Sequence, residues 1–163
     1  MRVLITYATR AGSTTEVAAT IAESLKERGY SVDVKPIKER PALTEYQAVV
    51  IGSAVRMGNW LPEAVEFVKA NRETLSRLPV ALFTVHMLNI GQDEQSRSNR
   101  LAYLNPVRPF ITPVDEAYFV GKMDFSRLSF FDRLIAKMVK AVEADHRDWE
   151  AIRAWASTVF AGR

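Results

Sequence analysis

The chain has 163 residues, of which 48% are hydrophobic and 25% are charged, and its formal net charge is +3. This length and composition predict a single globular domain, 1–163, with a hydrophobic core of its own. The chain contains no cysteine, which excludes disulfides, thiolate metal sites and cysteine nucleophiles, and no metal site is expected.

The first half of the chain alternates between strand and helix patterns. Residues 2–7 predict a buried strand, and apolar residues at helical spacing predict a helix over 14–28. Ser13 and Glu16 have the spacing of a capping box at its start, and Gly29 lies where a left-handed residue ends a helix.

Three further elements follow in the middle of the chain. Residues 31–37 alternate between apolar and polar, which is typical of an edge strand. Residues 48–52 and 80–85 are continuous apolar runs, as central parallel strands require. Pro62 marks the first residue of a helix between these two strands.

The pattern is less regular beyond residue 86, where 87–113 contains a glycine and three prolines. We expect a helix over 96–104, a fifth strand over 114–121, a basic amphipathic helix over 127–142 and a last helix over 148–160. The alternation predicts an α/β fold with a parallel sheet covered by helices on both faces.

Five strands in this order suit a flavodoxin-like, doubly wound, five-stranded parallel sheet of order 2-1-3-4-5. Ligands of such sheets bind beyond the carboxyl ends of the strands, where the strand order reverses. Three loops meet this condition, at 8–14, 53–60 and 86–89.

The first loop is rich in hydrogen-bond donors and precedes a helix. Such a loop is suited to a phosphate, because backbone N–H groups and hydroxyls converge at the positive end of the helix dipole. It has neither the glycine pattern of a dinucleotide site nor the Gly-Lys-Ser/Thr of a P-loop. Arg10 either adds a charge or points to solvent, and Ser13 and Thr14 bind the phosphate or merely cap the helix. The donors are Thr9, Arg10, Ala11, Gly12, Ser13, Thr14 and the hydroxyl of Thr15.

This loop resembles the signature of the flavodoxin family. The matching residues are Tyr7, Thr9, Gly12, Thr14 and Ala18, while Thr6 departs at a position that is usually apolar. The resemblance implies that FMN is bound non-covalently, with its phosphate in this loop.

The second loop flanks the isoalloxazine ring in proteins of this kind. Gly58 permits a positive φ that presents a carbonyl to the ring, or is an ordinary turn residue. Trp60 stacks on the ring or packs at the helix start. Arg56 stabilises the anionic reduced flavin or pairs with a carboxylate. The cofactor-binding candidates of this loop are Ser53, Ala54, Val55, Arg56, Met57, Gly58, Asn59 and Trp60.

The third loop is expected on the other side of the ring. Thr84 and Val85 offer backbone groups to the flavin edge, and His86 assists proton transfer or is structural. The candidates here are Thr84, Val85, His86, Met87, Leu88 and Asn89, and Arg56 and His86 are the candidate catalytic residues.

Read together, the loops resemble the flavodoxin-type, menaquinone-dependent protoporphyrinogen oxidases. The resemblance implies oxidation of protoporphyrinogen IX in heme biosynthesis, with a quinone as acceptor. One departure is the sequence 92–95, which replaces a stretch rich in lysine and arginine. The matching residues are Thr9-Arg10, Gly12, Thr14, Val49–Gly52, Arg56, Gly58, Phe131-Asp132-Arg133 and Asp148-Trp149-Glu150, and the residues nearest the substrate's propionates are taken to be Arg56, Arg97, Arg100 and Lys122.

Two other functions remain open. A flavodoxin acting as an electron carrier is usually acidic, whereas this chain is basic. A binding module without flavin is disfavoured by the intact hydroxyl loop. Response regulators and low-molecular-weight phosphatases are excluded, because they need clustered acids after the first strand and a cysteine, respectively.

The cellular location follows from what the sequence lacks. No apolar run approaches the roughly 18 residues of a membrane span, and Met1 leads directly into a strand, so we expect no signal peptide and a cytoplasmic protein. The 127–142 helix either lies on an anionic membrane, giving peripheral contact with a quinone pool, or packs in the core. Nucleic-acid binding is not expected, and a homo-oligomer remains open.

Overall fold

The computed structural model describes residues 1–10, 12–86, 93–120, 122–123, 144–145 and 148–162. Two sets of predictions lie outside the described residues. These are the cofactor-binding candidates Ala11, Met87, Leu88 and Asn89, and the helix predicted over 127–142. The elements in chain order are β1 (Arg2–Ala8), α1 (Ser13–Glu27), β2 (Ser31–Pro36), the 3₁₀ turn η1 (Ile37–Glu39), β3 (Ala48–Arg56), β4 (Asn59–Trp60), α2 (Pro62–Ala70), α3 (Arg72–Leu75), β5 (Val80–His86), α4 (Glu94–Ala102), β6 (Asp115–Val120), β7 (Lys122–Met123), β8 (Ala144–Asp145) and α6 (Trp149–Thr158).

The main sheet has the predicted doubly wound order. Its parallel strands run β2-β1-β3-β5-β6, which confirms the order 2-1-3-4-5 for the five predicted strands. The sheet also contains a sixth strand that was not predicted, because the short β4 pairs antiparallel with β3. A separate two-stranded antiparallel sheet joins β7 and β8.

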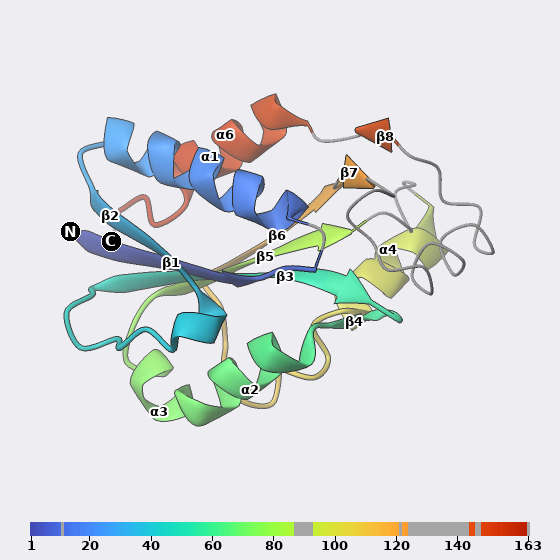
Figure 1. Ribbon diagram of the computed structural model, residues 1–163, viewed down its shortest axis with the longest axis horizontal. Coiled ribbons are helices and arrows are strands. Elements are labelled where there is room, and N and C mark those ends of the chain that lie inside the picture. The colour runs from blue at the N-terminus through green and yellow to red at the C-terminus, as the bar shows by residue number, and fades with distance from the viewer. Residues whose placement is uncertain (11, 87–92, 121, 124–143, 146–147, 163) are drawn as a thin grey trace.

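Two hydrophobic cores lie on opposite faces of this sheet, and β1 contributes to both. Val3 and Ile5 belong to the core under α1 and α6, whereas Leu4 belongs to the core under α2. Figure 1 shows α1 and α6 on one face and α2 and α3 on the other. Alternate residues of a strand point to opposite faces, so a strand buried on both sides must be apolar throughout. This explains the continuous apolar runs in the sequence.

The start of α1 differs from the prediction. The cap residue is Gly12 in a left-handed conformation (φ 87°), and no side chain provides a cap hydrogen bond. The capping box predicted for Ser13 and Glu16 is therefore wrong, because Ser13 already lies inside the helix. The other end agrees, since Gly29 also has a positive φ of 91°.

The remaining boundaries agree with the sequence to within a few residues. Strand β2 is at the edge of the sheet, and Pro62 opens α2, as predicted. Helix α4 starts earlier than expected, because the Asp93 carboxylate accepts the backbone N–H of Ser96 (3.0 Å). In the last helix, Asp148 caps in the same way, accepting from Ala151 N (3.0 Å).

Gly52 of β3 is packed directly against the ring of Phe83 in β5. A Cβ placed on Gly52 would lie 2.0 Å from Phe83 Cζ, and the ring is fully buried. We expect Gly52→Ala to lower the free energy of unfolding by about 1–3 kcal/mol, since a close-packed core cannot yield this space. Urea denaturation measures the change. The loss should shrink when Phe83→Leu is the background, and an equal loss in both backgrounds would contradict the clash.

Thr6 is buried in the middle of β1, and its hydroxyl has no hydrogen-bond partner among the described residues. We expect Thr6→Val to raise the free energy of unfolding by about 1 kcal/mol, because it removes an unsatisfied polar group at nearly constant shape. The matched variant is Thr84→Val, which removes the acceptor of the Trp60 indole N–H and should destabilise the fold. Both are measured by chemical denaturation, and destabilisation by Thr6→Val would contradict the assignment.

Candidate functional site

Strands β1, β3 and β5 bring the three predicted loops to one edge of the sheet. Their register places Ala8 beside Ser53, and Ser53 beside Thr84. The loops therefore leave the sheet together at the carboxyl ends of these strands (Figure 1). Because β2 lies on one side of β1 and β3 on the other, this is the point where the strand order reverses.

The first loop folds tightly around the start of α1. The backbone N–H of Gly12 donates to Thr9 Oγ1 (3.0 Å), and the backbone N–H of Thr15 donates to the Gly12 carbonyl (3.2 Å). Ser13 and Thr14 form the first turn of α1, and both are buried. Thr9 thus shapes the loop, while Ser13 and Thr14 lie at the positive end of the helix dipole.

The Thr14 hydroxyl is an unsatisfied polar group in this loop. Its side chain is fully buried, and Oγ1 has no hydrogen-bond partner within the described part of the chain. Buried hydroxyls are normally satisfied, so one left over in the first turn of a helix matches what a bound phosphate would complete. The loop therefore fits the phosphate that the sequence predicts.

Arg10 adopts neither of the two arrangements considered from the sequence. Its guanidinium forms a two-pronged ion pair with the carboxylate of Glu63 in the first turn of α2, with Nη2 3.2 Å from Oε2 and Nη1 also bonded to Oε1. Its positive charge is therefore balanced by a carboxylate from another element. Sequence reasoning missed Glu63, since nothing in a sequence signals a pair separated by 53 positions.

The second loop is a tight hairpin between β3 and β4. Arg56 pairs with Asn59 across it, and the two intervening residues, Met57 and Gly58, have φ of 56° and 78°. Two positive φ values in a two-residue turn define the type I′ hairpin. The predicted left-handed Gly58 is thus present, and the four tip residues 56–59 are exposed, with Met57 76% exposed.

Trp60 and Ser53 serve the core of this hairpin. Trp60 is only 2% exposed, and its indole N–H donates to Thr84 Oγ1 (2.8 Å). The hairpin thus returns the indole to the interior, and stacking of Trp60 on a flavin ring stays a prediction. The Ser53 hydroxyl donates to the Ala54 carbonyl (2.7 Å) and accepts the backbone N–H of Leu61 (3.0 Å), which ties β3 to the start of α2.

The described part of the third loop is buried as well. Thr84, Val85 and His86 end β5, and His86 is 4% exposed. The imidazole of His86 contacts the ring of Tyr103, with centroids 5.7 Å apart. The backbone N–H of Trp60 donates to the Tyr103 carbonyl (3.4 Å), so the chain after α4 joins the second and third loops. A role for His86 in proton transfer stays a prediction.

An arginine outside the predicted site holds the last turn of α4. The guanidinium of Arg108 donates to both carboxylate oxygens of Glu116 on β6 (2.8 and 3.0 Å) and to the Leu101 carbonyl (3.1 Å). No residue of α4 itself is buried. The polar contacts of Arg108 and the buried Tyr103 and Leu104 that follow therefore anchor this helix, which carries the candidates Arg97 and Arg100.

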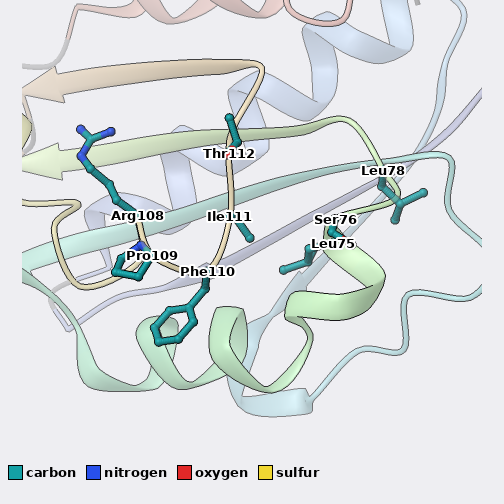
Figure 2. A pocket seen from close by; sticks show the side chains of 8 residues that line it. All are labelled: Leu75, Ser76, Leu78, Arg108, Pro109, Phe110, Ile111 and Thr112. Atoms are coloured by element: carbon teal, nitrogen blue, oxygen red, sulfur yellow. The ribbon is translucent and has the colours of Figure 1, made fainter.

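A hollow of about 230 Å³ lies away from these loops, beside the end of α3. Figure 2 shows Arg108 at one end of this hollow and Leu75 and Leu78 at the other, with the Arg108 side chain pointing away from both leucines. Since the guanidinium of Arg108 is occupied by Glu116, this hollow offers no free cation from that residue. Its lining residues are Leu75, Ser76, Leu78, Arg108, Pro109, Phe110, Ile111 and Thr112.

Two further searches cover only the described residues. None of the helices found there is long and apolar enough to cross a membrane. Within the same residues, no group of three or more His, Asp or Glu side chains is placed to hold a metal ion.

Comparison with known protein families decides the identity of this fold. The model of the flavodoxin domain matches residues 4–150. The chain belongs to the flavodoxin-domain family. FMN is accordingly the cofactor of this flavodoxin-domain protein, and the loop between β1 and α1 is the part of it that fits the FMN phosphate.

Relatives that align with nearly all of this chain carry a more specific name. The protoporphyrinogen IX dehydrogenase [quinone] of Escherichia coli K12 is 29% identical over 171 aligned residues, covering 98% of this chain and 94% of the relative. The protein of the same name from Leishmania major is 28% identical, covering 94% of this chain and 72% of the relative. The resemblance deduced from the sequence is thereby confirmed.

Solved structures agree with the fold. A short-chain flavodoxin associated with a bacterial microcompartment superimposes with a TM-score of 0.61 at 15% identity, covering 98% of this chain and 97% of that structure. At this identity the likeness speaks for the flavodoxin fold alone.

The unsatisfied hydroxyl of Thr14 gives a direct test of the phosphate loop. We expect Thr14→Val to leave the ligand-free protein as stable or slightly more stable, because no protein hydrogen bond is lost. FMN binding should weaken about tenfold or more, since a hydrogen bond to a charged group contributes about 1.5–3 kcal/mol.

Fluorescence titration with FMN and urea denaturation measure the two effects. Thr6→Val is the control, because it removes a comparable buried hydroxyl on the other face of the sheet. Unchanged FMN affinity in Thr14→Val would remove this hydroxyl from the phosphate site.

Proposed function

We propose that this flavodoxin-domain protein is an FMN-dependent oxidoreductase that oxidises protoporphyrinogen IX and passes the electrons to a quinone. The observation that carries the proposal is the similarity, over 98% of the chain, to a protein named for this reaction. Arg56 and Arg97 are both exposed, and cations beside the site would suit a substrate bearing carboxylates.

In this proposal the phosphate loop binds FMN and fixes its position. Thr9 shapes the loop, and Ser13 and Thr14 offer hydroxyls at the helix start, so the anionic end of FMN is held by α1. When bound, FMN supplies the redox chemistry, accepting electrons from the substrate and releasing them to the acceptor. The protein determines where these reactants lie and how their charges are stabilised.

The hairpin tip supplies charge at the edge of the site. Arg56 lies at the end of β3 and is exposed, and the type I′ turn fixes the backbone that carries it. A guanidinium there attracts carboxylate groups of a substrate and stabilises negative charge beside it. We propose that Arg97 and Arg100 of α4 add further positive charge for the substrate.

The cellular setting is part of the proposal. A quinone acceptor resides in a membrane, so we place the protein in the cytoplasm with peripheral contact at the membrane surface, through residues 127–142. The runner-up is a flavodoxin-type electron carrier, which the fold alone would equally allow.

Stepwise reduction of the FMN-loaded protein separates the two functions. Reduction directly to the two-electron state, followed by oxidation of protoporphyrinogen IX with a menaquinone analogue under anaerobic conditions, would support the enzyme. A long-lived one-electron state with no turnover of protoporphyrinogen IX would favour the carrier and overturn the proposal.

The proposed reaction should depend most strongly on Arg56. We expect Arg56→Ala to retain FMN but to lower kcat/KM for protoporphyrinogen IX about tenfold or more, because a charged contact to the substrate is lost. Arg56→Lys should recover part of the loss. Arg153→Ala, which removes an exposed arginine from α6, is the control, and full activity of Arg56→Ala would exclude Arg56 from the mechanism.

A further inference from the structure

The ion pair between Arg10 and Glu63 links two elements on opposite sides of the sheet. Arg10 belongs to the loop that leads into α1, whereas Glu63 is the second residue of α2. Helix α1 packs on one hydrophobic core and α2 on the other, and Figure 1 shows them on opposite faces. The guanidinium therefore reaches around the end of β1 towards α2.

This direction matters because the groups that would bind the phosphate lie at the start of α1. The unsatisfied Thr14 hydroxyl and the first backbone N–H groups of the helix belong to α1, and they are neutral donors. Arg10 is the loop's one cationic side chain among residues 9–14, as the sequence shows. Both prongs of its guanidinium are engaged by Glu63, so its charge is compensated at α2.

We propose that Glu63 is a positioning residue that holds Arg10 away from the phosphate site, so that the FMN phosphate is bound by neutral donors alone. Glu63 thereby lowers the affinity of the loop for phosphate and makes that affinity insensitive to salt. The inference deepens the FMN assignment and rests on it. It concerns the phosphate end of the cofactor and is independent of the identity of the substrate.

The charge state of Glu63 is consistent with this role. Burial alone would raise the pKa of its carboxyl, but the hydrogen bonds from Arg10 and from its own backbone N–H outweigh burial and lower the pKa below its usual value. Glu63 is therefore a carboxylate at neutral pH. The pair is half-exposed, with side chains 44% and 36% accessible, so the Arg10 side chain has room to turn once Glu63 is neutral.

The decisive variant is Glu63→Gln, which removes the charge and keeps the shape. Freed from its partner, Arg10 can turn to the phosphate, and we expect FMN to bind about two- to fivefold more tightly at low salt, the range of a half-exposed ion pair. The gain should disappear at high salt, because exposed charge interactions are screened. Riboflavin, which lacks the phosphate, should bind equally to both proteins. Fluorescence titration measures each affinity.

Two controls isolate the role of Arg10. Glu66→Gln removes an exposed carboxylate from the same helix, and it should leave FMN affinity unchanged. Arg10→Gln combined with Glu63→Gln should lose the gain seen with Glu63→Gln alone. A gain in Glu66→Gln as large as in Glu63→Gln would reduce the effect to general charge and overturn the proposal.

The opposite result is equally informative. If Glu63→Gln weakens FMN binding as much as Arg10→Gln does, the pair fastens the loop in place, and the proposal is wrong. If the unmodified protein binds riboflavin and FMN equally, the phosphate site itself has been misassigned. Failure of the unmodified protein to bind FMN at all would instead contradict the cofactor, which distinguishes the two levels of inference.

Discussion

The burial of the central sheet on both faces is the constraint on which this structure depends. Strands β1, β3 and β5 each present one face to α1 and α6 and the other to α2, so nearly every side chain within them must be apolar and closely packed. Gly52 is the clearest case, because the ring of Phe83 occupies the space where a side chain would be. Such a sheet has little room for chemistry in its interior. Polar groups that act on ligands are therefore concentrated where the strands end.

The hairpin after β3 shows how the backbone separates function from packing over a few residues. The type I′ turn at Met57 and Gly58 reverses the chain, which leaves Arg56 at the exposed rim and returns Trp60 to the core. Trp60 is then fixed by Thr84 of β5 and by the Tyr103 carbonyl. The base of the hairpin is therefore held by the core, whereas its tip, which carries Arg56, is exposed.

Much of the fold was predictable from the sequence, since it follows from local patterns. The apolar runs, Pro62 and Gly29 gave the parallel strands, their order and the boundaries of helices to within a few residues. The errors arose where local rules compete. Ser13 fits a capping box, but the left-handed Gly12 takes the cap position and draws Ser13 into the helix. Strand β4 was missed because two residues carry no periodicity.

The candidate site, like the fold, was predictable only where its residues are close together in sequence. The hydroxyl loop was predictable because its donors are close together in sequence, and its match to the flavodoxin signature falls within residues 7–18. The roles of Trp60 and Arg10 were not, because each is decided by a partner from a distant element, Thr84 in one case and Glu63 in the other. An aromatic or cationic residue next to a ligand loop is ambiguous until its partner is known.

Charge placement follows from the same distinction. The chain is only mildly basic, with a formal charge of +3, so its action on anions depends on where charges are free and not on their sum. Arg10, Arg28 and Arg108 are each held by partners within the fold: Arg10 and Arg108 pair with carboxylates, and Arg28 donates to the Ala156 and Val159 carbonyls. These contacts use cations to join elements. Arg97 of α4, by contrast, is exposed. The described donors of the phosphate loop are thus neutral or, in Arg10, balanced by a carboxylate, and under the proposed function the substrate would meet the exposed cations of other elements.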